Sequence, residues 1–129
     1  MKIRIYYEDT DCGNVVYYAN YLKYMERSRT ELLRDKNVDL ESYHNQGILF
    51  AVAEANIKYK YPARYNDILD VTSEITKVSG ASVHFETIMK NQKNKLIAKG
   101  KVTLACLENG KLRKIPESVL EKIKTSESG

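Results

Sequence analysis

Three carboxylates stand close together near the N-terminus of the chain. Glu8, Asp9 and Asp11 fall between a predicted strand and the predicted start of a helix. A carboxylate can attack a carbonyl carbon or take a proton from water. The N–H groups that open a helix can hold the oxyanion that such an attack forms. This combination favours acyl-group hydrolysis, and it needs neither a metal nor a histidine.

The same carboxylates also suit a purely structural role, because negative charge near a helix start stabilises the helix. The apolar run VVYY that begins at Val15 favours the catalytic interpretation, since pKa values shift where a carboxylate lies beside an aromatic slot. Cys12, next to Asp11, is a further candidate nucleophile. No histidine lies near Cys12 in the sequence to activate it. A cysteine is more commonly a small, half-buried structural residue than a nucleophile.

Alternation of apolar and polar residues predicts five strands. The first covers residues 2–8, with Ile3, Ile5 and Tyr7 on its buried face. The others are expected over residues 48–60, 68–77, 81–90 and 95–107. On the strand over 48–60, the apolar face would carry Leu49, Ala51, Ala53, Ala55, Ile57 and Tyr59. Turn signals between the later strands indicate an antiparallel meander.

A helical period replaces the alternation over residues 20–35. Its apolar stripe runs through Tyr21, Met25, Ser28 and Leu32, and Asn20 is the expected N-cap. Ser28 is small enough to let this helix approach a sheet closely. Shorter helices are expected over residues 39–46 and from near Pro116. One long helix and one sheet make a two-layer α+β domain whose open edges favour pairing with a second copy.

The composition is that of a globular protein of one domain, residues 1–129, with 43% hydrophobic and 29% charged residues. The sequence has no apolar run long enough for a membrane span and no apolar signal core, so the expected location is the cytoplasm. Two cysteines and two histidines argue against a disulfide framework, a metal site or a histidine-based triad. No metal and no cofactor are expected. The net charge of +4 favours an anionic partner, although many lysine-rich chains carry such a charge without one.

Several stretches resemble the hotdog-fold acyl-CoA thioesterases, and within them the YbgC-like enzymes, kin to 4-hydroxybenzoyl-CoA thioesterase. The stretches are YEDTD at 7–11, VVYYANY at 15–21 and ERSRTE at 26–31. The segment YKYPARYND at 59–67 resembles the stretch between the second and third strands of that family. The N-terminal motifs are specific, whereas the later strands are generic.

The resemblance implies a hotdog fold, in which a five- to six-stranded antiparallel sheet wraps a long central helix. It implies a homo-oligomer, a dimer or homotetramer, with the active site at the dimer interface. It also implies hydrolysis of acyl-CoA to the free acid and CoA, with Asp11 as nucleophile or general base. The thioester carbonyl would face backbone N–H groups near Tyr17 and Tyr18, and Tyr7 and Tyr18 would shape the site or position the carboxylate.

Substrate contacts follow from the same resemblance. Val16 and Tyr17 would line the acyl slot. Positively charged side chains at the rim would hold the phosphates of CoA. The candidates are Lys58, Lys60, Arg64 and Lys90. Each of these is more often an ordinary solvated charge.

Two residues depart from the subgroup's pattern. Tyr18 stands where the subgroup usually has histidine, so the side chain can donate its hydroxyl but cannot shuttle a proton near neutral pH. This substitution puts rate and substrate choice in doubt. Asn14 stands where glycine is usual, and asparagine tolerates a left-handed backbone better than most residues.

Three other functions compete with hydrolysis. A hotdog hydratase would need a catalytic histidine in its own motif, and the sequence has no such motif. A hotdog domain that binds an acyl-thioester without turning it over is compatible with the missing histidine. A basic nucleic-acid binder would bind in a salt-sensitive way, but the carboxylate cluster argues against it. The interpretation is therefore a thioesterase, with a non-catalytic acyl-thioester-binding domain as the alternative.

Overall fold

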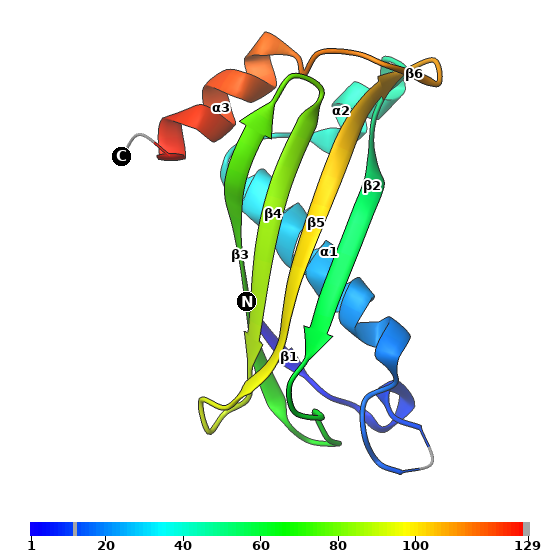
Figure 1. Cartoon of the computed structure of the whole chain (residues 1–129), viewed down its shortest axis with the longest axis vertical. Helices are drawn as coiled ribbons and strands as arrows, with labels where there is room; N and C mark the ends of the chain where they lie inside the picture. Colours follow the sequence, from blue (N-terminus) through cyan, green and yellow to red (C-terminus); the bar gives the residue numbers. More distant parts are fainter. Residues whose placement is uncertain (12, 128–129) are drawn as a thin grey trace.

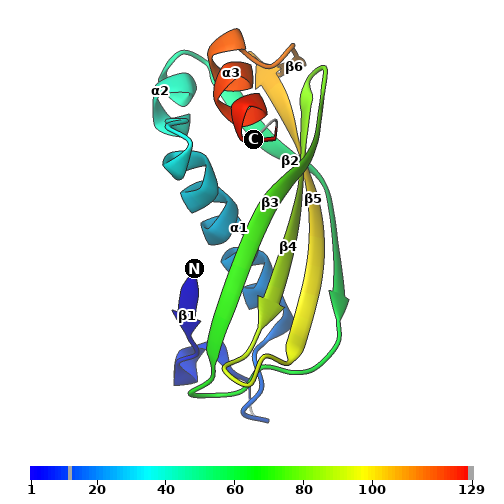
Figure 2. The ribbon, with the colours of Figure 1, turned by 90° about the vertical axis from the view of Figure 1, so that its left-hand side faces the viewer.

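The computed structural model describes residues 1–11 and 13–127 of the chain. One long helix, α1 (Tyr18–Asp35), lies against one face of a curved antiparallel sheet (Figure 1). The shorter helices α2 (Leu40–Asn45) and α3 (Glu117–Glu127) lie toward one end, on the same side of the sheet as α1. Figure 2 shows that, among the described residues, no helix covers the opposite face of the sheet. The predicted two-layer α+β architecture is confirmed.

The strands run in the spatial order β1-β3-β4-β5-β2, and every neighbouring pair is antiparallel. Their bounds are β1 Lys2–Arg4, β2 Ile48–Tyr59, β3 Ile68–Ser79, β4 Ser82–Lys90 and β5 Leu96–Glu108, with β6 Lys111–Leu112 paired to β5. The long strands agree with the predicted ranges to within two residues. Because β1 and β2 lie at the two ends of this order, each leaves one edge without a partner strand in the described part of the chain.

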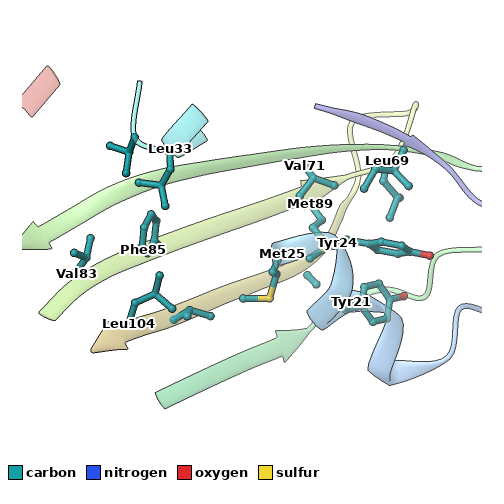
Figure 3. Close-up of a cluster of buried hydrophobic side chains, with 14 of the residues drawn as sticks. Tyr21, Tyr24, Met25, Leu33, Leu69, Val71, Val83, Phe85, Met89 and Leu104 are labelled. Carbon is teal, nitrogen blue, oxygen red and sulfur yellow. The ribbon is translucent and has the colours of Figure 1, made fainter. Parts of the chain in front are cut away.

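The face of α1 that meets the sheet is the one that the helical period predicts. Figure 3 shows Tyr21, Met25 and Leu33 of α1 packed over side chains of β3, β4 and β5. Ser28 is buried, and its hydroxyl lies 2.8 Å from the Ser73 hydroxyl and 3.4 Å from the Val71 carbonyl oxygen. The small side chain thus lets α1 approach β3, as predicted.

The first strand is shorter than predicted. It ends at Arg4, and Tyr7–Asp9 form a 3₁₀ turn, η1, that leaves the Tyr7 side chain 69% exposed rather than buried. The cause is local, because the Asp9 carboxylate accepts the Tyr6 N–H at 2.8 Å and draws the chain into the turn. Ile3 and Ile5 are buried as predicted.

The buried face of β2 differs from the predicted one because the strand contains a β-bulge. The register against β5 shifts between Val52 and Glu54, so the alternation changes phase there. Ile48 is therefore buried, and Leu49, which was expected on the inner face, is 41% exposed. Beyond the bulge, Ile57 is half-buried against the core as predicted.

Gly100 of β5 lies directly under α1 and has no room for a side chain. A Cβ at this position would lie 2.6 Å from the Met25 sulfur and closer still to its methyl carbon. The clashing atoms are the flexible end of the Met25 side chain, which is buried and must repack within the core to make room. We therefore expect Gly100→Ala to lower the free energy of unfolding by about 1–3 kcal/mol, the usual cost of overpacking a core.

Urea unfolding of the purified protein measures this effect. The matched double variant, Gly100→Ala with Met25→Leu, shortens the facing side chain and should recover part of the loss. An unchanged unfolding midpoint in the single variant would show that the contact between α1 and β5 is looser than the structure indicates.

Candidate active site

Asp11 is held in a tight loop between η1 and α1. Its N–H donates to the Val15 carbonyl oxygen at 3.0 Å, and its Oδ1 accepts the Gly13 N–H at 2.9 Å. The loop turns through Asn14, whose φ is 61°. Asn14 thus adopts the left-handed conformation that was expected of it in place of glycine. The second carboxylate oxygen of Asp11 makes no hydrogen bond within the described residues and is free to act on a substrate.

The start of α1 lies beside this loop. The Asp9 carbonyl oxygen accepts both the Tyr17 N–H at 3.0 Å and the Asn20 side-chain amide at 2.8 Å. Asn20 is therefore not the N-cap that the sequence predicted, since Tyr17 holds that position. The Tyr18 N–H is the first in the helix, and no acceptor for it lies among the described residues. It is a donor that remains for an incoming anionic oxygen.

A cavity of about 270 Å³ opens between the start of α1 and the end of β2. The loop supplies one wall, the first turn of α1 another, and the segment after β2 a third. The lining residues are Asp11, Val15, Val16, Tyr18, Tyr21, Tyr59, Lys60, Tyr61 and Pro62. The cavity is thus mainly apolar and aromatic, with one carboxylate and one ammonium group among its side chains.

Aromatic contacts hold the walls of the cavity together. The Tyr59 ring centroid lies 5.3 Å from that of Tyr18 and 5.4 Å from that of Tyr21, which joins β2 to α1. The Tyr21 hydroxyl accepts the buried Ala63 N–H at 3.1 Å and thereby fixes the segment after Pro62. Burial raises the pKa of the Tyr21 phenol, so this group stays neutral at physiological pH.

Tyr21 and Tyr24 form a natural pair of test positions on α1. Figure 3 shows both rings at the same end of the buried cluster. The Tyr24 hydroxyl is buried and makes no hydrogen bond of normal geometry within the described residues, although the Asp9 carboxylate lies close by, whereas the Tyr21 hydroxyl accepts the Ala63 N–H. Burial, assisted by the nearby Asp9 carboxylate, raises the pKa of the Tyr24 phenol.

We expect Tyr21→Phe to lower the free energy of unfolding by about 1–3 kcal/mol, because it leaves the buried Ala63 N–H unpaired. Tyr24→Phe, the matched control, should be neutral or stabilising, because it removes a buried hydroxyl that makes no hydrogen bond of normal geometry. Chemical denaturation of both variants measures the difference. Equal losses in the two variants would contradict the assigned hydrogen bond.

Four of the residues predicted for the site meet in this cavity: Asp11, Val16, Tyr18 and Lys60. Tyr17 flanks them as the N-cap, with its ring centroid 6.4 Å from that of Tyr18. The fold thus brings the loop, the helix start and the end of β2 together from distant parts of the sequence.

The other predicted residues do not line the cavity. Tyr7 packs edge-on against Tyr65, 5.8 Å between ring centroids, in a separate shallow groove. Lys58 points to the uncovered face of the sheet, and Lys90 ends β4 opposite Asp70. Arg64 pairs through its backbone with Val15, so its exposed side chain lies next to the cavity wall. Cys12 lies outside the described residues.

Sequence reasoning did not assign Tyr59, Tyr61 or Pro62 to the site. The signal that could have found them is the pair of tyrosines just before Pro62, at the end of β2. Within the described residues, no group of three or more His, Cys, Asp or Glu side chains could hold a metal ion. In the same part of the chain, no helix has the length and apolar character to cross a membrane.

Comparison with known proteins shows the family to which the chain belongs. The family model of the thioesterase-like superfamily matches residues 6–123. The chain belongs to this superfamily. Acyl-CoA thioester hydrolase YbgC of Escherichia coli O157:H7 is 36% identical over 124 residues, which are 95% of this chain and 92% of that protein. Acyl-CoA thioesterase YbgC of Haemophilus influenzae is 39% identical over 115 residues, which are 88% of this chain and 83% of that protein. The resemblance to YbgC-like thioesterases is thus confirmed.

Solved structures of other proteins share the fold. A protein of Aquifex aeolicus superposes with a TM-score of 0.89 at 28% identity, over 95% of this chain and 97% of that one. The 1,4-dihydroxy-2-naphthoyl-CoA thioesterase of Synechocystis superposes with a TM-score of 0.90 at 21% identity, over 96% and 93% of the two chains. The hotdog fold predicted for this thioesterase-like chain is confirmed.

Proposed function

We propose that the protein hydrolyses acyl-CoA thioesters to the free acid and CoA at the cavity between the α1 start and the β2 end. The observation that carries the proposal is one of geometry. Asp11 and Tyr18, the first residue of α1, line one mainly apolar cavity. Within the described residues, Asp11 has a free carboxylate oxygen and the Tyr18 N–H has no acceptor. The superfamily and the names of the YbgC relatives support the same reaction.

In the proposed mechanism, the thioester carbonyl oxygen accepts a hydrogen bond from the Tyr18 N–H. Asp11 then acts in one of two ways. As a general base it takes a proton from water, whose oxygen attacks the carbonyl carbon. As a nucleophile it attacks that carbon itself and forms a mixed anhydride, which water then hydrolyses. In both cases the Tyr18 N–H stabilises the oxyanion, the carbon–sulfur bond breaks and CoA leaves as the thiolate.

The cavity offers aromatic rings for an acyl group and positively charged side chains for the phosphates of CoA. The acyl group would lie against the rings of Tyr18, Tyr21 and Tyr59. Lys60 in the lining and Arg64 beside it would meet phosphates of CoA at the rim. The roles of Tyr7, Lys58 and Lys90 in substrate binding or catalysis stay predictions.

We further propose that the protein works as a homo-oligomer, a dimer or tetramer of single-domain hotdogs spanning residues 1–129. The cavity would then lie at the interface between two protomers. Tyr18 is 69% exposed, and Tyr59 is 48% exposed, in the single chain, so a second protomer has room to complete the walls. The cytoplasmic location inferred from the sequence stays a prediction.

The test is thiol release from a panel of short-chain, long-chain and aromatic acyl-CoA esters, with binding of a non-hydrolysable acyl-CoA thioether measured in parallel. Hydrolysis of at least one class is expected, and the preferred class names the acyl group. Tight thioether binding without release of CoA from any ester would instead favour the non-catalytic domain. Tyr18, which is exposed and stands where the subgroup usually has histidine, would then be the first residue to examine.

A further inference from the structure

Three exposed tyrosines line the shallow groove that lies outside the candidate active-site cavity. Tyr6, Tyr7 and Tyr65 are 60%, 69% and 46% exposed. The groove has a volume of about 750 Å³, which is large enough for a small molecule. Its lining residues are Arg4, Tyr6, Tyr7, Glu8, Tyr65 and Asn66. Large exposed rings that share one hollow mark a surface for binding rather than for folding.

Two of these rings form a T-shaped pair. The ring centroids of Tyr7 and Tyr65 lie 5.8 Å apart, and the ring planes make an angle of 74°. A flat ligand that stacks on one ring therefore meets the other ring edge-on, and aromatic rings favour both arrangements. The groove thus suits a planar aromatic ligand better than an aliphatic chain.

The polar groups of the groove match those of a nucleotide. Arg4 donates one guanidinium N–H to the Asn66 carbonyl oxygen at 3.1 Å, which fixes the guanidinium while its other N–H groups can still bind a phosphate. The Glu8 carboxylate and the Asn66 amide offer acceptors and donors for the polar edge of a base. Since Glu8 would repel a phosphate, the phosphate is expected at Arg4.

Both walls of the groove are attached to the loop that carries Asp11. The Thr10 N–H donates to the Tyr7 carbonyl oxygen at 3.0 Å, on one side of the loop. The Tyr65 N–H donates to the Asn14 carbonyl oxygen at 3.3 Å, on the other side. The groove is therefore held at a fixed place relative to the candidate active site.

One ligand can reach the cavity and the groove together. Pro62 lines the cavity and Tyr65 lines the groove, and three residues of chain span at most about 11 Å. In Figure 1 the segment after β1 and the connection from β2 to β3 lie at the end of the molecule where α1 begins. The extended pantetheine arm of CoA, which separates the thioester from the nucleotide, is longer than this gap.

We propose that the groove binds the adenine nucleotide end of CoA, with the base stacked in the Tyr7–Tyr65 pair and the 3′-phosphate at Arg4. Lys60 and Arg64, at the cavity rim, would meet the diphosphate that comes before the nucleotide along the ligand. The inference rests on the acyl-CoA substrate of the proposed function, but binding in the groove does not require hydrolysis.

Binding of two non-hydrolysable thioethers tests the stacking. Isothermal titration calorimetry compares an acyl-CoA thioether with the matching acyl-pantetheine thioether, which lacks the nucleotide. Tyr65→Ala and Tyr7→Ala should each raise the dissociation constant of the acyl-CoA thioether about tenfold, the usual effect of losing one ring that stacks on a base. Neither should change the dissociation constant of the pantetheine thioether. Tyr65→Phe, the matched control, keeps the ring and should keep the affinity.

A third thioether, made from 3′-dephospho-CoA, tests the place of the phosphate. Arg4→Gln should raise the dissociation constant of the acyl-CoA thioether about tenfold and leave that of the dephospho analogue unchanged. Arg34→Gln removes an exposed guanidinium at the far end of α1 and should change neither. Thermal unfolding of every variant checks that the fold is intact.

The comparison between ligands decides the outcome. Equal losses for the acyl-CoA and pantetheine thioethers would show that the tyrosines only support the Asp11 loop, and would overturn the proposal. A wild-type chain that binds both thioethers equally well would also overturn it. Adenosine 3′,5′-bisphosphate that binds without competing with the acyl-CoA thioether would assign the groove to a separate nucleotide, with the same consequence. Absence of CoA release from every ester would contradict hydrolysis alone, since the readout here is binding.

Discussion

Asp11→Asn is expected to lower kcat for acyl-CoA hydrolysis about 10³-fold, in the range that removal of a general base or nucleophile usually costs. The asparagine side-chain oxygen can still accept the Gly13 N–H that Asp11 accepts at 2.9 Å, so the loop keeps its shape. What the variant loses is the negative charge and the second carboxylate oxygen. Substrate affinity should therefore change little, and steady-state kinetics on the preferred ester separates the two quantities.

Asp9→Asn is the matched control for this prediction. Asp9 lies in the same acidic segment, and its carboxylate accepts the Tyr6 N–H at 2.8 Å instead of lining the cavity. Asparagine can keep that hydrogen bond, so the control should retain most of the activity. If both variants lost activity equally, the acidic segment would be acting as a structural unit and the catalytic role of Asp11 would be wrong.

Tyr18→Pro is the second change with a large expected effect. Proline has no N–H, so the variant removes the proposed oxyanion donor and should lower kcat about 10²–10³-fold. Helices accept proline at their first residue, where Tyr18 stands. Tyr17 before it has a ψ of 137°, the extended conformation that a residue preceding proline favours. The helix should therefore keep its stability while it loses one N–H.

Tyr18→Ala separates the backbone from the side chain. It keeps the N–H and removes the ring that contacts Tyr59, so it should raise KM more than it lowers kcat. Thermal unfolding of both variants checks that α1 is intact. Similar kcat values for the proline and alanine variants would contradict the assignment of the Tyr18 N–H as the oxyanion donor.

The elements of the fold could be predicted because their signals are local. The helical stripe through Tyr21, Met25 and Ser28 has a period that only an α-helix satisfies. The alternation of Val83, Phe85, Thr87 and Met89 equally requires a strand with one buried face, and all of these side chains are buried. Most strand boundaries follow from turn residues such as Asn109 and Gly110, whose positive φ angles the tight turn needs.

The features that escaped prediction depend on contacts between distant parts of the chain. The bulge in β2 arises from its pairing with β5, and it reverses the faces that Leu49 and Ile48 would otherwise take. The side-chain bond of Asn20 depends on where the Asp9 carbonyl oxygen lies in the folded loop, whereas the turn at Tyr7–Asp9 has a local cause, the bond from the Tyr6 N–H to the Asp9 carboxylate. Local propensity placed Asn20 at the N-cap, but a tertiary acceptor was available and Tyr17 took the position.

The residues of the candidate site fall into the same two groups, those that a local motif reveals and those that only the fold brings in. Asp11, Val16 and Tyr18 could be found because they share one short motif at a strand-to-helix junction. Tyr59 and Tyr61 meet them only because the end of β2 packs beside the start of α1, which no local pattern reveals. Lys58 and Lys60 shared one pattern in the sequence, yet only Lys60 reaches the cavity, because β2 ends at Tyr59 and Lys60 lies beyond the regular alternation of the strand.

The most direct test of the central claim is single-turnover hydrolysis of the preferred acyl-CoA ester in ¹⁸O-labelled water, with enzyme in excess. Mass spectrometry then follows the label in the released acid and in the peptide that contains Asp11. We predict release of CoA with uptake of one heavy oxygen. Label in the Asp11 peptide would show an anhydride that water opens at the Asp11 carbonyl carbon, whereas label in the acid would show that water attacks the acyl carbon. CoA release and labelling of the acid at an undiminished rate in Asp11→Asn would contradict the account.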